Sequence, residues 1–522
     1  MKNRASALAI AVAVSFSVAL LGLPGTAIAA SAKKKPPSPP PSPPPSASST
    51  YVKAFSAIVN GTTLNLTPNE VQATSDGGDI ALAQTNSPAG QQVSWLVKLN
   101  SVGVPQWQEM LSCASTTGTD GSIGGLSLQQ TADGGFIVAG GTLDCGSGSS
   151  CPAVSGHQCA LVVKLDPAGD VSWARVYDAS VSGVIRQVRQ TADGGYVAAG
   201  TALDSQNNVG AMILKLDASG NVQWQQELTP ANSTGAYFNS VVQNSGGGYV
   251  ATGDFYTATS AGTKTQALVA SFGADGSPGF QREFTAVDSG QVTSVSDATS
   301  IISTSDGGYA VSGTWFDSAF GGGVGAHGGL LLKLDSGGNL QWQRAYTGGQ
   351  FCFSGGGGAD EACTNIGVES NSVHQTGDGG FVLAGDGDLE LANEVPLVPW
   401  QAKVDAGGNL LWQHFYYQSA PTGAPISADF SSSALTPGGG SLAAGLTESL
   451  NSPDDKLFAA STDGSGLVGS SCGDIHAATP LQAVDPGLTE QTTVLAVQPV
   501  TTSPVNSALT VTPTSVTTQT DC

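Results

Sequence analysis

The fold is decided by residues 191–200, Thr-Ala-Asp-Gly-Gly-Tyr-Val-Ala-Ala-Gly, together with residues 214–224, Leu-Lys-Leu-Asp-Ala-Ser-Gly-Asn-Val-Gln-Trp. Seven copies of this pair recur about sixty residues apart, and a period of that length is typical of a propeller or a solenoid. The first-half turns are centred on Asp76, Asp133, Asp193, Gly246, Asp306, Asp378 and Gly438. Repeated units share one continuous core, so the copies indicate one domain rather than the several that the length alone suggests.

Each half of the repeat predicts a β-hairpin. Asp-Gly-Gly and Gly-Asn supply residues that tolerate positive φ, which tight turns need, and β-forming residues stand on both sides. Two hairpins make four short strands, which is the content of one propeller blade. Runs such as 161–163 and 330–332 are apolar on both faces, as expected for strands packed between neighbouring blades. We therefore expect an all-β, seven-bladed β-propeller with four-stranded antiparallel blades.

Residues 51–57 give a separate signal for ring closure. They resemble the strand that follows a Trp in other repeats, such as residues 342–346, and the seventh repeat lacks a clear strand of this kind. We expect this N-terminal strand to complete the last blade and close the ring. The alternative is an independent N-terminal strand.

The repeat resembles a family of secreted bacterial β-propeller-repeat proteins, many of them uncharacterised exported or surface proteins. The shared motif is Thr-x-Asp-Gly-Gly-Tyr/Phe-x-x-Ala-Gly followed by Lys-Leu-Asp-x-x-Gly-Asn-x-x-Trp, and it covers residues 51–470. The resemblance implies a propeller but no established reaction. Its second half also looks like the tryptophan-docking motif of quinoprotein propellers, which holds adjacent blades together. That likeness implies a structural docking role for Trp107, Trp173, Trp224, Trp342 and Trp412.

The charge balance excludes two classes of partner. The chain has 40 acidic and 18 basic residues, for a formal net charge of -22. Nucleic-acid binding needs a basic surface, and an anionic membrane surface also attracts cations, so neither partner fits. Charged residues make up only 11% of the chain, against a usual value of about 25%, so the surface must be built mainly from small polar residues.

The N-terminus predicts export. Lys2 and Arg4 precede an apolar run over residues 7–23, and small residues end at Ala29, so residues 1–29 read as a cleaved signal peptide. An uncleaved membrane anchor is the alternative. No later segment is apolar enough to be read as a transmembrane span. We expect a secreted or cell-surface bacterial protein that acts as a monomer.

Three further regions follow the expected signal peptide. Residues 30–50 form a linker rich in Lys, Pro and Ser, which is either a semi-rigid stalk or an unstructured leader. The propeller is expected over residues 51–471. Residues 472–522 are rich in Thr, Val and Pro and lie outside the repeat, and we expect an extended or short-stranded extension there.

The eight cysteines predict disulfides, because an even number in an exported chain is typical of paired cysteines. Cys352 and Cys363 share one Gly-rich loop and most simply pair with each other. Cys472 and Cys522 bracket the C-terminal extension and are candidates to close it. The remaining four, whose pairing the sequence leaves open, are Cys113, Cys145, Cys151 and Cys159. A metal site is the alternative, but paired C-x-x-C spacing is absent, so we expect neither metal nor cofactor.

Loop lengths favour one face of the expected ring as the working surface. The hairpin turns are short and uniform, whereas the connections between hairpins and between blades vary. Variable loops on a rigid scaffold usually carry binding, although neutral drift would also make loops vary. The variable connections are residues 142–159, 230–238, 314–328, 347–370 and 386–399.

Two aromatic pairs enter these connections. Trp315-Phe316 and Phe255-Tyr256 occupy the same place in consecutive blades. Exposed rings there could stack on sugars or contact a partner, although half of each pair is expected to be core. The repeated turn aspartates could instead be read as calcium ligands, but one per blade spreads them too far apart to share an ion.

Two functional readings remain. The first is an exported, non-catalytic binding or surface-display scaffold for a glycan or an extracellular protein. The second is a propeller enzyme, either a carbohydrate-active hydrolase or lyase or a quinone-dependent oxidoreductase. We assign no catalytic residue from the sequence. A glycan enzyme would need two carboxylates that converge at the ring centre.

Overall fold

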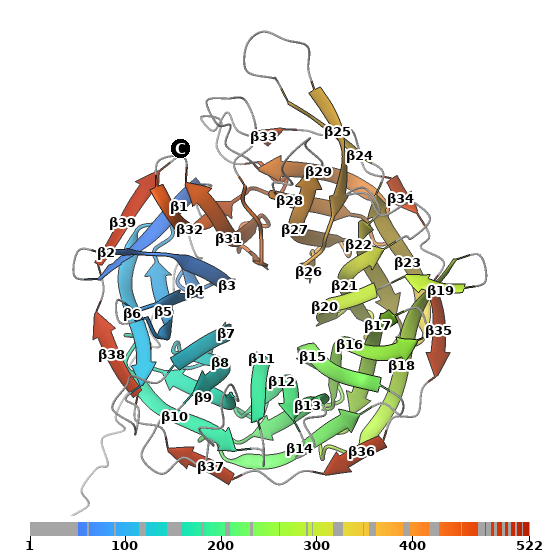
Figure 1. The fold of residues 1–522 in the computed structure, drawn as a ribbon, viewed down its shortest axis with the longest axis horizontal. Helices are drawn as coiled ribbons and strands as arrows, with labels where there is room; N and C mark the ends of the chain where they lie inside the picture. The colour runs from blue at the N-terminus through green and yellow to red at the C-terminus, as the bar shows by residue number, and fades with distance from the viewer. Residues whose placement is uncertain are drawn as a thin grey trace, which may run out of the picture. The chain divides into compact units, whose positions relative to one another are not determined.

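The computed structural model describes residues 51–467 with gaps, together with seven short strands between residues 475 and 520. The gaps are residues 60–61, 88–89, 114–121, 144–157, 179–181, 204–208, 230–232, 260–261, 289–290, 295, 317–326, 348, 354–361, 390–396, 417–426 and 450–451. The described residues form seven four-stranded antiparallel blades arranged in a ring (Figure 1). The expected seven-bladed propeller is therefore confirmed. In the described residues, no helix has the length and apolarity that a membrane crossing requires.

The blades follow one another along the chain, and each is built from the ring centre outward. Blades 1 to 3 are β3 (Leu66–Ala73), β4 (Asp79–Asn86), β5 (Gln92–Leu99) and β6 (Pro105–Cys113); β7 (Ser122–Gln130), β8 (Phe136–Leu143), β9 (Cys159–Leu165) and β10 (Val171–Asp178); and β11 (Ser182–Gln190), β12 (Tyr196–Leu203), β13 (Val209–Leu216) and β14 (Val222–Thr229). Blades 4 to 6 are β15 (Ser233–Gln243), β16 (Tyr249–Thr259), β17 (Gly262–Phe272) and β18 (Pro278–Asp288); β20 (Ser296–Ser303), β21 (Tyr309–Phe316), β22 (His327–Leu334) and β23 (Leu340–Thr347); and β26 (Ser372–Gln375), β27 (Phe381–Leu389), β28 (Leu397–Val404) and β29 (Leu410–Tyr416).

Blade 7 joins the two ends of the propeller. Its strands are β30 (Ser432–Leu435), β31 (Ser441–Ser449), β32 (Ser452–Ser461) and the N-terminal β1 (Tyr51–Val59). β1 pairs antiparallel with β32, with Tyr51 opposite Ser461 and Phe55 opposite Leu457, which confirms closure by the N-terminal strand. The buried Lys53 of β1 also donates to the carbonyl of Val102 in blade 1, at 2.7 Å, so the same strand ties the last blade to the first.

Further strands extend beyond the blades. β2 (Thr62–Leu64), β19 (Gln291–Ser294), β24 (Gly349–Phe353) and β25 (Ala362–Val368) lie at their ends. The C-terminal strands are β33 (Ile475–His476), β34 (Gln482–Val484), β35 (Leu488–Thr492), β36 (Ala496–Pro499), β37 (Ser503–Asn506), β38 (Leu509–Pro513) and β39 (Ser515–Thr520). Within the variable connection at 347–370, the described residues include β24 and β25, which pair antiparallel with each other.

The first-half turn of blade 3 shows why the motif repeats. Thr191 and Gly195 close the hairpin through a 2.9 Å backbone bond, and Gly194 has a φ of 81°, which glycine tolerates best. The carboxylate of Asp193 accepts from the Gly195 amide at 3.0 Å and from the Thr191 hydroxyl. The turn therefore needs an acceptor, a hydroxyl and a flexible residue at fixed spacing, which is the Thr-x-Asp-Gly-Gly pattern.

The repeated Lys lies beneath this turn and joins the two hairpins of a blade. Lys215 is 2% exposed and lies 2.9 Å from the Asp193 carboxylate, and it also donates to the carbonyl of Leu216. The hydrogen bond from Thr191 and the Lys215 ammonium lower the pKa of Asp193 to about 2. Partial burial of the carboxylate acts in the opposite direction and is outweighed. The other turn aspartates that pair with a repeated Lys in this way are Asp76, Asp133, Asp306 and Asp378. Each such aspartate holds a turn and a lysine, which accounts for its place in the repeat without an ion.

Adjacent blades are joined by an aromatic ring from one blade that covers a turn of the next. Trp173 of blade 2 lies against Gly220 of blade 3 and meets Tyr196 edge to face, with ring centroids 5.9 Å apart. Tyr177 of the same strand donates to the carbonyl of Gly220 at 2.8 Å. The structure places Trp107, Trp224, Trp342 and Trp412 at equivalent blade–blade contacts. Phe280 takes this place in the degenerate fourth repeat.

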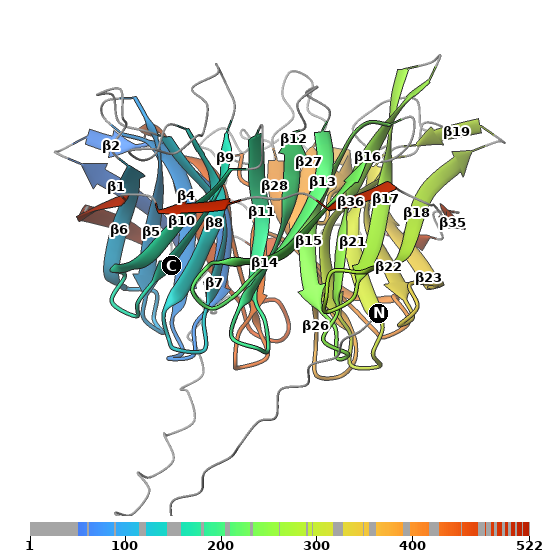
Figure 2. The same ribbon diagram turned by 90° about the horizontal axis from the view of Figure 1, so that it is seen from below.

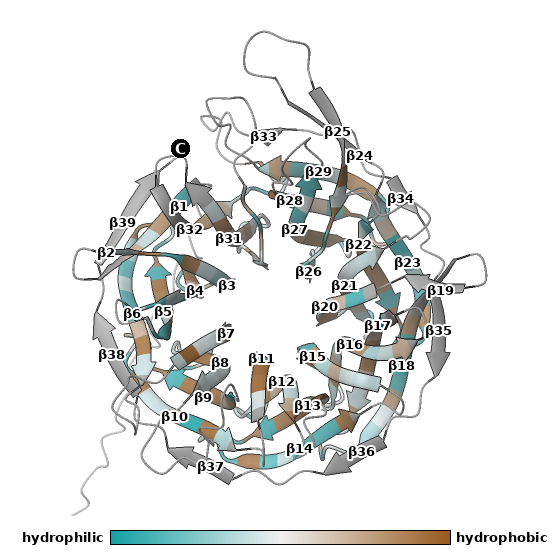
Figure 3. Cartoon of the chain, in the orientation of Figure 1, coloured by the Kyte–Doolittle hydropathy of each residue, from teal (hydrophilic) through white to brown (hydrophobic). Residues whose placement is uncertain are grey.

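The hydrophobic core is distributed between the blades, because each blade buries both faces against its neighbours. One cluster joins Ile137 and Val162 of blade 2 to Val188 and Leu214 of blade 3. Figure 3 shows hydrophobic positions on strands all around the ring. Figure 2 shows the tight hairpin turns on one side of the ring, which leaves the connections between hairpins and blades on the other.

The contact between Trp173 and Gly220 predicts different costs at two glycines that share one backbone conformation. Gly194 and Gly220 have φ values of 81° and 79°. Replacing either by Ala costs about 1–2 kcal/mol from left-handed strain. At Gly220 the new Cβ would also lie 2.9 Å from the Trp173 ring, whereas nothing lies within 4 Å at Gly194. We expect Gly220→Ala to cost roughly twice as much free energy as Gly194→Ala.

Thermal and urea unfolding of the two variants measure this difference, with the Gly194→Ala protein as the control for backbone strain. Equal losses of stability would mean that the packing of Trp173 on the next blade adds nothing to the cohesion of the ring.

Candidate functional site

The innermost strand of each blade lines a channel on the axis of the ring. Its volume is about 930 Å³, and its walls come from β3, β7, β11, β15, β20, β26 and β30. That volume lies in the usual range for ligand pockets, about 300–1,000 Å³. A single site built from all seven repeats is therefore available at the ring centre (Figure 1).

One residue of each inner strand projects into the channel. It stands seven positions before the centre of the first-half turn, and in blades 1 to 5 it falls at an irregularity in the pairing of the two inner strands. Such a bulge redirects a side chain that regular pairing would turn toward a neighbouring blade. The seven residues at this position are Asn69, Leu126, Arg186, Asn239, Thr299, Asn371 and Ser431. The channel thus carries a ring of polar side chains, broken once by a leucine.

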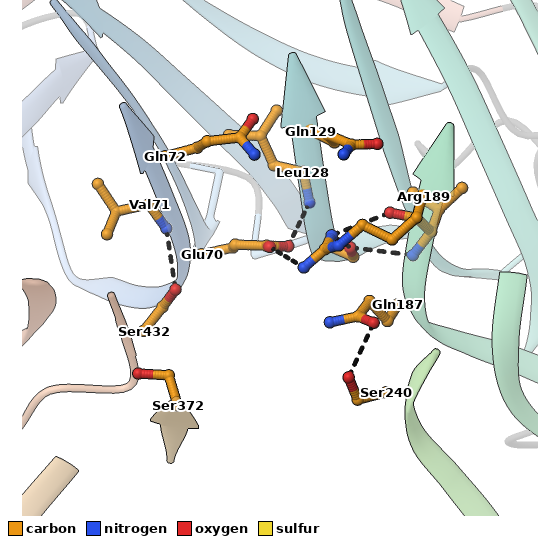
Figure 4. Close-up of polar contacts among 12 residues, drawn as sticks. Glu70, Val71, Gln72, Leu128, Gln129, Gln187, Arg189, Ser240, Ser372 and Ser432 are labelled. Atoms are coloured by element: carbon orange, nitrogen blue, oxygen red, sulfur yellow. Dashed lines mark hydrogen bonds and ion pairs between the residues drawn. The ribbon is translucent and has the colours of Figure 1, made fainter. Parts of the chain in front are cut away.

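In most blades, the next residue along the strand ties its blade to the following one. The amide of Leu128 donates to the Glu70 carboxylate at 2.6 Å (Figure 4), and the amide of Val241 donates to Gln187 at 2.7 Å. The Ser432 hydroxyl accepts from the Val71 amide at 3.3 Å, which carries the same pattern across the closure from blade 7 to blade 1. These bonds hold the channel walls in place, so the site is formed before any ligand arrives.

An ion pair reinforces one side of the wall. Glu70 of blade 1 and Arg189 of blade 3 approach to 2.7 Å across the strand of blade 2, with side chains 13% and 25% exposed. Arg189 also donates to the Ser127 hydroxyl at 3.3 Å. His374 of blade 6 contacts the carbonyl of Ser433 at 2.8 Å, and burial lowers its pKa. Glu70 and Arg189 neutralise each other. Among the described residues that line the channel, Arg186 is then the cation without an ion-pair partner.

A group of carboxyls lies near the channel, and two of its members, Asp254 and Asp297, line it. The members come from the starts of the inner strands and the ends of the second strands of blades 4 to 7. The group consists of Asp254, Asp297, Glu369, Asp386, Asp388 and Asp429. Burial raises the pKa of every member. We call this group the carboxyl arc.

Mutual repulsion adds to burial within the carboxyl arc. Burial, and then the charge of Asp297, raise the pKa of Asp254 to about 8. Burial, and then the charges of Asp388 and Asp297, raise the pKa of Glu369 to about 6. Burial and the charge of Glu369 raise the pKa of Asp386 well above its ordinary value. Perturbed carboxyls of this kind concentrate at functional sites.

Three members of the arc accept hydrogen bonds that tie them to the fold. Asp254 accepts from the amide of Ala298 at 2.8 Å and from Asn239 at 2.9 Å, so it links blades 4 and 5. Asp386 accepts from Asn371 at 2.9 Å, and Asp429 accepts from the amide of Leu446 at 2.6 Å. Asp297, Glu369, Asp388 and Asp429 are only partly buried, and of these Asp297 also lines the channel.

Aromatic groups lie beside the arc. The hydroxyls of Tyr237 and Tyr256 are hydrogen-bonded, and their rings are 5.5 Å apart. The guanidinium of Arg186 lies 4.4 Å from the centre of the Tyr237 ring. At the other end of the arc, His327 lies 3.4 Å from Asp388, and burial lowers the pKa of this histidine. The mouth of the channel therefore combines carboxyls, a cation and two phenols.

The aromatic residues singled out in the sequence divide between core and site. Phe255 and Trp315 are 2% and 8% exposed and pack in hydrophobic clusters between blades. Tyr256 is partly exposed beside the channel mouth, and the side chain of Phe316 lies outside the described residues. The prediction of ligand binding at these pairs stays a prediction, and the geometry now directs attention to Tyr256.

The cysteine predictions are mostly beyond the described side chains. Cys159 is half of a disulfide. Cys352 and Cys363 stand directly opposite each other in the pairing of β24 and β25, which is compatible with the predicted bridge. The side chain of Cys113 and the whole of Cys145, Cys151, Cys472 and Cys522 lie outside the described residues. No group of His, Cys, Asp and Glu suited to a metal ion occurs among the residues that the structure covers.

The carboxyl arc was missed at the sequence level, although a signal was present. Asp297, Glu369 and Asp429 each stand nine residues before the centre of their own first-half turn. Aligning the repeats on that turn brings the three into one column. Asp386 and Asp388 were assigned to a variable connection, but both lie within β27, where their side chains are fixed.

Comparisons with known proteins leave the function open. No protein-family model and no curated protein matches the chain. A protein of unknown function from Dyadobacter fermentans is 10% identical, with 78% of this chain and 97% of that chain covered and a TM-score of 0.41. A polysaccharide lyase of family 25, an ulvan lyase bound to a -[GlcA(1-4)Rha3S]- saccharide, is 10% identical over the same shares, with a TM-score of 0.43. A GH43_12 protein retrieved from the capybara gut metagenome is 10% identical over 84% of this chain and 99% of that chain, with a TM-score of 0.25. Likeness at this level carries no argument about activity.

The raised pKa of Glu369 predicts a pH-dependent gain in stability for Glu369→Gln. A carboxyl whose pKa is about 6 when folded and 4.5 ordinarily stabilises the fold below pH 4.5, and this contribution is lost as the pH rises through 6. Gln stays neutral at every pH. We expect equal melting temperatures for the variant and the wild type at pH 4, and a more stable variant at pH 8, by up to about 2 kcal/mol. Melting curves across this range measure it, and a pH-independent difference would contradict the raised pKa.

Proposed function

We propose that the protein is an exported, saccharide-binding propeller whose ligand enters the central channel from the side of the variable connections. The observation that carries this proposal is the ring of bulged polar side chains around a channel of about 930 Å³. A bulge at the same position in successive blades turns one side chain per blade toward the channel, and most of these side chains can form hydrogen bonds. This deepens the expectation of a binding scaffold and gives it a location.

The chemistry of the lining supports a hydroxyl-rich ligand. Asn, Gln, Ser and Thr present both donors and acceptors, and each hydroxyl of a sugar is itself a donor and an acceptor. Most of these side chains are already oriented by bonds to a neighbouring blade, so little side-chain entropy is lost on binding. The phenol rings of Tyr237 and Tyr256 add flat apolar faces beside polar groups, which suits the mixed surface of a pyranose.

The charge of the mouth argues against polyanionic saccharides. The carboxyl arc comes from four of the seven blades, and the whole chain carries a net charge of -22. A uronate or sulfated chain would meet like charge there, which costs binding free energy. A neutral or amino saccharide is therefore the class we propose. The ulvan lyase bound a saccharide that contains glucuronate, and this chain is not expected to share that ligand.

Arg186 provides the test of the binding site. It faces the channel over Tyr237, whereas Arg175 lies 5.7 Å from the Trp173 ring on the outer strand of blade 2 and serves as the matched control. We expect the purified protein to bind neutral or amino polysaccharides on a glycan array. Arg186→Gln should weaken binding about tenfold or more, because it removes a charged hydrogen-bond donor, and Arg175→Gln should not. Calorimetry with the best-binding oligosaccharide measures the change.

Binding that ignores both arginine variants would place the saccharide elsewhere on the molecule. Absence of binding to every neutral and amino glycan would overturn the proposal.

A second candidate function is hydrolysis of the bound glycan, and Asp297 and Glu369 favour it. They occupy equivalent positions in adjacent blades, and the charge of Asp297 helps to raise the pKa of Glu369 to about 6. A carboxyl with a raised pKa can donate a proton to the leaving glycosidic oxygen, while a neighbouring carboxylate activates water or attacks the anomeric carbon. Asp297 lines the channel and its charge acts on Glu369, which supports this second candidate.

Reducing-end release separates the two functions. If the site is hydrolytic, the wild type should release reducing sugar from a bound glycan. Glu369→Gln should then abolish release while binding is kept, because Gln accepts and donates hydrogen bonds but cannot transfer the proton. Tight binding with no release by the wild type would leave the non-catalytic function alone.

A further inference from the structure

The C-terminal strands form a belt around the propeller. Each one pairs antiparallel with the outermost strand of a different blade: β33 with β29, β34 with β23, β35 with β18, β36 with β14, β37 with β10, β38 with β6 and β39 with β1. The seven pairings visit blades 6, 5, 4, 3, 2, 1 and 7 in that order. The tail therefore passes once around the ring, against the direction in which the chain builds the blades (Figure 1).

The length of the tail fits this path. Successive belt strands begin at residues 475, 482, 488, 496, 503, 509 and 515, which is one strand for every six to eight residues. At about 3.3 Å per extended residue, this step spans roughly 20–26 Å, enough to pass from the rim of one blade to the next. The tail thus has a spacing of its own, with one belt strand for each of the seven blades, and this spacing is much shorter than the sixty-residue repeat.

Strand twist explains how a tail that runs around the ring can pair with blades that stand along its axis. Each strand of a sheet is rotated by about 20–25° relative to its neighbour, so the rotation accumulates from the channel to the rim. Figure 2 shows the outer strands lying obliquely and the belt strands running nearly around the circumference. Each blade therefore presents an edge that a circumferential strand can extend.

The composition of the tail suits an outermost strand. Thr and Val favour extended structure, whereas proline lacks an amide and is tolerated in sheets mainly at edges. Pro499, Pro504 and Pro513 all lie within belt strands. A belt strand has a blade on one side only, so an amide that faces outward can be missing without the loss of a bond.

The last belt strand covers the strand that closes the ring. β39 pairs with β1 over six residues, from Lys53 opposite Thr520 to Ile58 opposite Ser515. β1 in turn pairs with β32 to complete blade 7. The two terminal segments of the propeller thus pair with each other, so if β1 leaves blade 7, β39 must either leave with it or lose its pairing.

We infer that residues 475–520 act as a strap that docks after the ring has closed and then holds it closed. The belt needs the outer edges of all seven blades, and these edges exist together only in the finished ring. Once seated, the belt occupies the outer edge of every blade and crosses each blade boundary except the one between blades 6 and 7, so opening at a crossed boundary strains or detaches a belt segment. Its hold comes from backbone pairing, so it does not depend on any one side chain.

Proline variants of the full-length protein test the seats one at a time. Neighbouring amides of a strand point in opposite directions, so one of Val497→Pro and Gln498→Pro removes an amide that faces β14. We expect that variant to speed hydrogen exchange of β14 amides by tenfold or more, while Val497→Ala and Gln498→Ala leave exchange unchanged. If the β14 amides of the wild type exchange as fast as an unpaired edge, the belt is not seated there and the inference fails.

Cleavage of the folded protein tests the strap as a whole. A protease site is inserted after Val468 in a Cys472→Ser/Cys522→Ser background, which excludes a covalent hold through these cysteines. We expect the cut tail to remain with the propeller on size-exclusion chromatography in native buffer, and to leave only as the ring unfolds. A tail that separates at once would overturn the strap. So would a shortened protein that ends at Val468 and unfolds at the same rate as the full-length protein.

Discussion

The structure depends on one packing constraint, that an aromatic ring of a blade rests on a turn of the next blade, as it does in blades 1 to 6. Trp173 rests on Gly220, and equivalent contacts recur around the ring. A single blade cannot satisfy this constraint, because both of its faces are apolar and need neighbours. Other features hold the apolar faces of neighbouring blades against each other. They are the pairs between a buried Lys and a turn Asp, the short uniform turns and the closing strand β1. The cohesion of the molecule is therefore a property of the closed ring.

Rigidity of the ring makes the channel a credible site. In blades 1 to 4, the side chain that follows the bulged residue bonds to the next blade, so these groups around the channel are held by the same contacts that hold the blades. Polar groups that are fixed before binding lose little freedom when a ligand arrives. The carboxyl arc is the exception, since its buried charges oppose one another and leave that part of the rim under electrostatic strain. Strain of this kind is typical of functional regions.

The repeat made most of the architecture predictable. Thr-x-Asp-Gly-Gly has a local physical meaning, because the Asp193 carboxylate must accept from Thr191 and Gly195 for the turn to close. The closing strand was also predictable, since residues 51–57 match the strand that blade 7 lacks. The site was harder, because Asp297, Glu369 and Asp429 come from three repeats and meet only when the ring forms. Bulges such as that at Arg186 leave no mark in the sequence pattern, and the belt strands pair with edges that exist only in the folded propeller.

The carboxyl arc has a further consequence for a ring of nearly equivalent blades. Seven identical blades would present the same surface after each rotation by one blade. A ligand on the axis would then have no preferred orientation. Blades 4 to 7 carry the acids, whereas the equivalent positions at the starts of the inner strands of blades 1 to 3 are Thr67, Gly124 and Val184. The mouth therefore has an electrical polarity across its diameter, directed from one half of the ring to the other. Because the copies have diverged, one direction across the repetitive ring differs from all others, and an asymmetric ligand can bind in one preferred orientation.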